Sequence, residues 1–168
     1  MASPSRIATL AALPVALLAG LGVFWALGGF PSAPSTSAVP ATAGQLDQDT
    51  AAVCRALVAR LPESLGGLDR RPVTAGGEQN AAFGDPPIVL SCGVAGGPIP
   101  QNAQLLTLSN VCWYPEERSA ETVWQSVDRK VPLRVVVPKD AEGSWVVNLS
   151  PPIVATVPET ATPGPVHC

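Results

Sequence analysis

The sequence predicts an α+β fold, in which one amino-terminal helix packs on a mainly antiparallel five- to six-stranded sheet, preceded by a transmembrane helix. Three features lead to this prediction. A long segment without charges comes first, an amphipathic helical segment follows it, and short β-branched segments with hairpin-length links make up most of the rest. Such a set of elements buries its apolar surface when the helix lies across one face of the sheet.

Residues 7–30 carry no charged side chain. About 20 apolar residues rising ~1.5 Å each cross a bilayer, so we expect a transmembrane helix or an uncleaved signal anchor here. Residues 1–6 contain Arg6, whereas the first charge beyond the segment is Asp47. This asymmetry predicts a single-pass protein of the cell membrane with a cytoplasmic amino-terminal end and an extracytoplasmic domain. Secretion after cleavage near Ala43 is the alternative.

The chain beyond this segment divides into three parts. Residues 31–45 are rich in Pro, Ser, Ala and Thr and predict a stalk, since this composition has little to bury. Residues 46–158 are expected to form the extracytoplasmic α+β domain, and residues 159–168 a tail.

The domain is expected to begin with a helix over residues 46–61. Its apolar residues recur at steps of three and four, which is the spacing of one helix face. Asp47 or Asp49 can accept the free N–H groups at its start, and Pro62 ends it.

Strands are expected to follow the helix. The Gly-Asp-Pro-Pro turn of residues 84–87 leads into the central strand, and Ser109-Asn110 and the polar residues 128–130 form two hairpin turns. Trp145 to Leu149 is expected as the last strand before Pro151-Pro152. The expected strands cover residues 88–94, 105–108, 111–114, 122–127, 133–137 and 145–149, and residues 70–74 are a short edge-strand candidate that Pro72 weakens.

The four cysteines predict a disulfide framework, because an even number in a small domain beyond an export signal is typical of one. The alternative is four buried free thiols. No zinc or other metal site is expected, since the chain lacks a CxxC pair and has one histidine, His167. Four cysteines allow three connectivities. The layout favours Cys54–Cys92, between helix and central strand, and Cys112–Cys168, which holds the tail.

Several of these segments resemble one family. They are the cysteine-containing helix of residues 53–62, Arg70-Arg71, residues 82–90 with Cys92-Gly93, Trp113, and residues 135–138. Together they are similar to the actinobacterial domain-of-unknown-function family 3515, over most of residues 53–158. The resemblance implies a small protein with a membrane segment or export signal and without an assigned activity. Phe83 stands where the family pattern has tryptophan, and Cys112 and Cys168 lie outside the motif.

The sequence excludes several function classes. The net charge is −3, and no basic stripe interleaves with aromatic residues, so no nucleic-acid partner is expected. Because His167 is the only histidine, a Ser-His or Cys-His pair is possible only through the tail. No phosphate loop or dinucleotide fingerprint is present, so no cofactor is expected.

Two functional hypotheses remain. The first is a non-catalytic binding or accessory protein of the cell envelope, attached to the membrane through residues 7–30, whose partner is an envelope protein or a cell-wall component. The second is an envelope hydrolase or transferase that uses carboxylates such as Asp85. We expect the first, and therefore no enzyme. Aromatic faces and planar donors favour recognition, although the tryptophans also suit a core. The candidate patch consists of Arg70, Arg71, Phe83, Asp85, Trp113 and Tyr114.

Overall fold

The computed structural model describes residues 18–25, 35–141, 145–160 and 168. The chain divides into two compact units, Met1–Ala33 and Pro34–Cys168. In the first unit, the described residues 18–25 form a helix. All strands and the two longer helices belong to the second unit, which is the subject of the rest of this section.

The predicted transmembrane helix over residues 7–30 and the single-pass membrane localisation are not supported. Among the described residues, no helix is long and apolar enough to cross a membrane. The helix of residues 18–25 reaches about 12 Å at ~1.5 Å per residue, which is short of a hydrocarbon core of ~30 Å. The other parts of the predicted span, and the predicted cytoplasmic end, lie outside the described residues.

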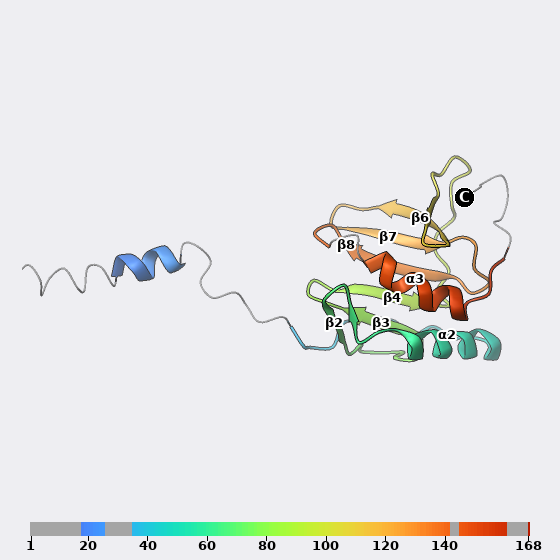
Figure 1. The fold of residues 1–168 in the computed structure, drawn as a ribbon, viewed down its shortest axis with the longest axis horizontal. Coiled ribbons are helices and arrows are strands. Elements are labelled where there is room, and N and C mark those ends of the chain that lie inside the picture. Colours follow the sequence, from blue (N-terminus) through green and yellow to red (C-terminus); the bar gives the residue numbers. More distant parts are fainter. Residues whose placement is uncertain (1–17, 26–34, 142–144, 161–167) are drawn as a thin grey trace, which may run out of the picture. The chain divides into compact units, whose positions relative to one another are not determined.

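The second unit is built on one antiparallel sheet of eight strands in the order β1-β2-β3-β4-β8-β7-β6-β5 (Figure 1). β4 and β8 lie in the middle, and two short strands, β1 and β5, form the edges. The strands are β1 (Ser64–Leu65), β2 (Leu68–Arg71), β3 (Asn80–Phe83), β4 (Ile88–Cys92), β5 (Leu106–Leu108), β6 (Val111–Glu117), β7 (Glu121–Ser126) and β8 (Leu133–Pro138).

Two helices, α2 (Gln48–Arg60) and α3 (Trp145–Thr156), contact each other and cover one face of this sheet (Figure 1). The hydrophobic core lies between the helices and this face. Three tryptophans join α3 to β6 and β7, because the Trp145 ring meets Trp113 and Trp124 edge to face at 6.1 and 5.5 Å between centroids. Other large side chains buried here include Leu57, Phe83, Ile88, Leu90, Leu133, Leu149 and Ile153.

Two features of the predicted fold class are wrong. The sheet has eight strands rather than five to six, since β1 and β3 extend it beside β4. The predicted last strand is the beginning of α3. Trp145, Leu149 and Ile153 are buried at intervals of four residues, which is the period of a helix that presents one face to a core. Pro151 and Pro152 lie within this helix.

Other local predictions are confirmed. Asp47 caps α2 by accepting hydrogen bonds from the N–H groups of Asp49 and Thr50, each at 3.0 Å. Ser109 and Asn110 form the two-residue link between β5 and β6, and their φ angles of 48° and 66° are those of a tight hairpin turn.

The cysteines form two disulfides in the pairing that the sequence favours, and the described residues include no free cysteine. Cys54–Cys92 joins α2 to β4, with 5.6 Å between the Cα atoms. Cys112–Cys168 joins β6 to the last residue, with 6.0 Å between the Cα atoms.

Residues 35–45, which the sequence analysis assigns to a stalk, lie against the domain; we call them the strap. Val39 is 3% exposed. Its N–H donates to the Pro72 carbonyl at 2.8 Å, and its carbonyl accepts from the Thr74 N–H at 2.9 Å, as in a short parallel strand pair. The strap carbonyls of Thr42 and Gly44 accept hydrogen bonds from the Asn80 and Gln79 side chains. The stalk assignment therefore does not hold for residues 35–45, while residues 31–34 lie outside the described residues.

Candidate functional site

The sheet has two faces of different character. Successive side chains of a strand point to opposite faces, so the burial pattern assigns them. Ile88, Leu90 and Cys92 of β4 face the helices, and Leu133, Val135 and Val137 of β8 do the same. The residues between them, which are half-buried, point to the opposite face. We call this second face the open face, since neither α2 nor α3 covers it.

Two rows of side chains cross the open face through the cross-strand register. One row is polar: Ser91 of β4 pairs with Arg134 of β8, and Arg134 pairs with Gln125 of β7. The neighbouring row is apolar and consists of Val89, Val136 and Val123. Side chains directly opposite in such pairs lie about 5 Å apart. Val123 is fully buried, so the middle of the open face presents Val89 and Val136 beside a cation and a hydroxyl group.

Two segments of the chain cross the open face and leave its middle uncovered. The strap lies beside β2 and β3 and contacts Val73 and Asn80. Residues 93–105 connect β4 to the distant edge strand β5 and pass over β7. At Gly96 this segment is so close to the Gln125 side chain that an added Cβ would lie 1.6 Å from the Gln125 Oε1. Only glycine fits there without a shift of that side chain.

The uncovered part is a groove of about 530 Å³. Its floor consists of Val89 and Ser91 of β4 and Arg134 and Val136 of β8. One wall is the strap at residues 39–42, and the other is formed by Ala120 and Glu121. Prolines of the β3–β4 turn and the end of β8 close one end, and Val94 lies at the other.

The floor of the groove contains a cation without a partner. Arg134 is half-buried, and its guanidinium has no hydrogen bond or ion pair among the described residues. Glu121 in the wall is engaged differently, because its carboxylate pairs with Arg118 at 3.3 Å. A half-buried guanidinium has lost part of its hydration, so hydrogen bonds to a planar anion stabilise it.

The structure does not bring the six residues of the predicted patch together. Phe83 and Trp113 are fully buried in the core on the helix side. Arg70 points to the same side, where its guanidinium donates to the Val58 carbonyl of α2 at 3.2 Å. Tyr114 lies on the open face of β6, opposite Gln125.

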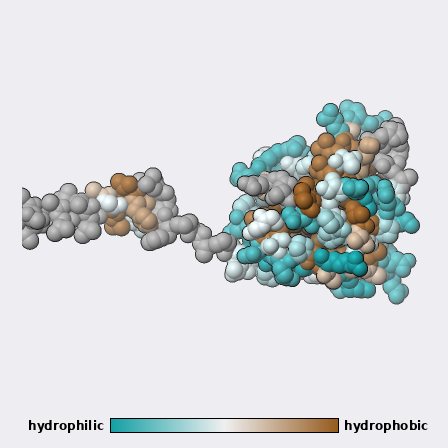
Figure 2. All heavy atoms as spheres, in the orientation of Figure 1, coloured by the Kyte–Doolittle hydropathy of each residue, from teal (hydrophilic) through white to brown (hydrophobic). Residues whose placement is uncertain are grey.

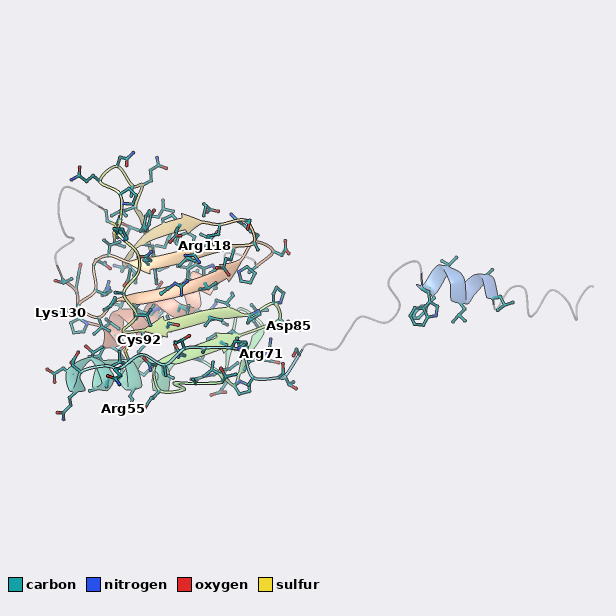
Figure 3. All side chains as sticks on the ribbon, turned by 180° about the vertical axis from the view of Figure 1, so that it is seen from behind. Arg55, Arg71, Asp85, Cys92, Arg118 and Lys130 are labelled. Atoms are coloured by element: carbon teal, nitrogen blue, oxygen red, sulfur yellow. A yellow bond between two sulfur atoms is a disulfide. The ribbon has the colours of Figure 1, made fainter. Side chains whose placement is uncertain are left out.

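Two patch residues, Arg70 and Phe83, lie opposite each other in the β2–β3 pair, and another two, Arg71 and Asp85, are joined through their side chains (Figure 3). They form an ion pair at 3.7 Å between Arg71 NH1 and Asp85 Oδ1. Arg71 also donates to the Gly84 carbonyl at 2.9 Å and to the Ser37 carbonyl at 2.8 Å. The other oxygen of Asp85 accepts from the Ser35 N–H at 2.9 Å. This pair therefore fixes the strap to the β3–β4 turn. Tyr114 lies five strands away from Arg71, which is about 24 Å at the spacing of neighbouring strands.

The groove residues Val89, Ser91, Arg134 and Val136 are absent from the predicted patch. A signal for Arg134 exists in the sequence, since it is the one charged residue in the otherwise apolar strand expected over residues 133–137. The sequence of the strand does not indicate which of its faces the helices cover. Arg134 points into the core if the helices cover its own face, and into a groove if they cover the other face.

Among the described residues, no three His, Cys, Asp or Glu side chains gather as a metal site. His167, which the sequence predicts to be a residue of the tail, lies outside the described residues. The predictions that the chain is not an enzyme and needs no cofactor stay predictions.

These features define a disulfide-bonded domain in which two helices cover one face of an eight-stranded antiparallel sheet and a groove crosses the other. The chain belongs to the family described as protein of unknown function (DUF3515), whose pattern matches residues 11–162. The match confirms the family resemblance seen in the sequence. Comparisons with curated proteins and with solved structures found no match.

Proposed function

We propose that this chain is a non-catalytic binding domain and that the groove on its open face is the binding site. The observation that carries the proposal is the uncovered middle of the sheet between the strap and residues 93–105. Concave sites with an apolar floor and a few polar groups are typical of ligand binding. The strap supports the proposal because it is fixed at Arg71 and at Val73, which gives the groove a preformed wall.

The chemistry of the lining favours binding over catalysis. Acid–base or nucleophilic catalysis needs a group that takes or gives a proton near neutral pH. The lining has two charged side chains: Glu121 is paired with Arg118, and Arg134 is a guanidinium, which has donors but no acceptor. The hydroxyl groups of Ser91 and Thr42 have no histidine, lysine or cysteine beside them in the lining. Asp85, the residue of the hydrolase hypothesis, is engaged by Arg71 and the Ser35 N–H.

The disulfides support an oxidising compartment as the place of action, because such bonds persist where thiols are not kept reduced. We therefore propose a partner in such a compartment, and a cell-envelope protein or a wall polymer remains the expected class. Mild reduction is not expected to open Cys54–Cys92, since both cysteines are fully buried.

Photo-crosslinking in the cells that make the protein tests the proposal. A photoreactive amino acid at Val136 on the groove floor is expected to give one discrete adduct, which mass spectrometry identifies. The same probe at Val147 of α3, which is 62% exposed on the helix side, is the matched control. Equal adducts from both positions, or none above background at Val136, contradict a binding site in the groove.

A further inference from the structure

We propose that the ligand of the groove is an extended acidic peptide segment, whose carboxylate side chain pairs with Arg134. This inference rests on the proposed binding function and names the class of its ligand. Three properties of the groove lead to it: the unpaired cation, the spacing of the floor residues and the chemistry of the lining.

The first property is charge. Arg134 is the cation in the lining, and no described residue pairs with it. A carboxylate meets a guanidinium with two parallel hydrogen bonds, which are stronger than those between neutral groups. The hydroxyl of Ser91, directly across the strand pair from Arg134, is a second donor on the same face. The floor thus offers donors for a carboxylate and selects against a cationic side chain.

The second property is spacing. Arg134, Val136 and Pro138 follow one another at alternate positions of β8 and all line the groove. Alternate residues of an extended chain are about 6.6 Å apart, both in β8 and in a bound peptide. An extended peptide that lies along β8 can therefore place an acidic side chain on Arg134 and the second residue beyond it on Val136. Because β8 is already paired with β4 and β7, the peptide is held through its alternate side chains and not as an added strand of the sheet.

The third property is the absence of aromatic side chains among the lining residues. A sugar ring packs on an aromatic face, and the four valines and four prolines of the lining supply none. The groove also has polar groups on its floor, which does not suit an acyl chain. Among the anionic polymers, the lining therefore favours a peptide.

Fluorescence anisotropy with synthetic peptides tests the assignment on the full chain. The probes are labelled extended peptides of alternating threonine and valine, with a glutamate, glutamine or lysine in place of one valine, and an array varies the flanking residues. We expect the glutamate peptide to bind about tenfold or more tightly than the glutamine peptide. Arg134→Gln is expected to remove this difference. Arg55→Gln, which changes an exposed arginine of α2 on the helix side, is expected to keep it.

Each other outcome overturns the inference in a distinct way. Equal binding of the glutamate and glutamine peptides contradicts the pairing with Arg134 and leaves a groove that binds peptides. Binding of polyglucuronate that depends on Arg134, without peptide binding, replaces the peptide by a carboxylated polymer. No binding of any peptide overturns the ligand class. The proposed binding function is contradicted as well only when the photoreactive probe at Val136 also gives no adduct in cells. Circular dichroism and thermal unfolding of the variants exclude misfolding.

Discussion

The side chain of Arg71 attaches residues 35–45, the strap, to the domain. Its side chain is 9% exposed, and the guanidinium reaches the strap at Ser37, the β3–β4 turn at Gly84, and the Asp85 carboxylate. The strap has few apolar side chains, and Val39 is its buried one. Hydrogen bonds from a charged group therefore carry much of its attachment, and the wall of the groove depends on them.

The first prediction concerns this arginine. Arg71→Met keeps the aliphatic stem but removes the donors, so we expect the free energy of unfolding to fall by about 2–3 kcal/mol in urea. Limited proteolysis should then cut the strap at residues 35–42 before the rest of the domain. Arg118→Met is the control, because its ion pairs are exposed and contribute less than about 0.5 kcal/mol. Equal effects of the two substitutions contradict the role assigned to Arg71.

Arg129 is a second residue whose position differs from the sequence-based expectation. The polar residues 128–130 are predicted to form a hairpin turn, and within it Arg129 is only 8% exposed and pairs with Asp128 at 3.2 Å. Its guanidinium donates to the carbonyls of Asn110 and Val157. It thus joins the β5–β6 turn to the end of α3. A charged residue can therefore be buried where the fold places backbone carbonyls around it that accept its hydrogen bonds.

At the scale of the element, α2 begins as the sequence predicts. The pKa of Asp47 lies below its usual value, because the Thr50 hydroxyl and then the Thr50 N–H donate hydrogen bonds to its carboxylate, with a smaller contribution from the Asp49 N–H. A folded-state pKa below the unfolded one stabilises the fold at pH values above the unfolded pKa, about 3.9. This contribution is lost as the pH falls through the folded-state value.

The second prediction follows from this sign. Asp47→Asn keeps a cap acceptor but does not titrate, so its deficit in unfolding free energy relative to the natural chain should be larger near pH 7 than near pH 3. Urea unfolding at the two pH values measures the difference. Asp49→Asn changes a carboxylate in the same turn that is not the cap residue and serves as the control. A deficit that grows on acidification contradicts the capping role.

The third prediction concerns α3, the element that sequence reasoning assigned to a strand. In a strand Val147 and Leu149 lie on the same face, whereas in this helix Leu149 is fully buried and Val147 is 62% exposed. Leu149→Ala should therefore cost about 3 kcal/mol, and Val147→Ala about 0.5 kcal/mol or less. Chemical denaturation of both variants measures the costs. Comparable losses of unfolding free energy at both positions would contradict the helix and support a strand.

The elements show which parts of the fold the sequence can predict. The local sequence is sufficient to predict an element where its residue types favour one structure. The Asp47 cap, the Ser109-Asn110 turn and the central strand are such cases. The local sequence is misleading for α3, because its valines favour a strand and Pro151-Pro152 indicate a break. The segment is a helix because this conformation buries Trp145 and Leu149 in the core. β3 was missed because Ala81 and Ala82 give little β-branched signal.

The groove was missed for a different reason. Its floor comes from β4 and β8, which are separated by 40 or more residues in the chain and are brought together by pairing. The predicted patch gathered residues that are conspicuous in the sequence, and Phe83 and Trp113 are instead buried in the core. A surface site depends on strand order and on which face the helices cover, and neither is contained in the local pattern.

The molecule as a whole combines a stabilised helix side with an uncovered sheet side. Cys54–Cys92 holds α2 to β4 and closes a loop of 38 residues, which is worth about 4 kcal/mol when the unfolded chain is constrained. Figure 2 shows the helix side, where hydrophobic side chains occur in small patches among hydrophilic ones. Scattered apolar residues of this kind are usual on protein surfaces. The opposite face contains the groove, and there the unpaired Arg134 distinguishes a binding site from plain surface.

The most direct test of this account is the location of the bound ligand, measured from the valine methyl chemical shifts during titration with the glutamate peptide. We expect Val89 and Val136 on the groove floor to shift together, while Val147 and Val154, exposed on α3, keep their positions. The largest shifts at Val147 and Val154, or unchanged valine signals at saturating peptide, would contradict a binding site on the open face.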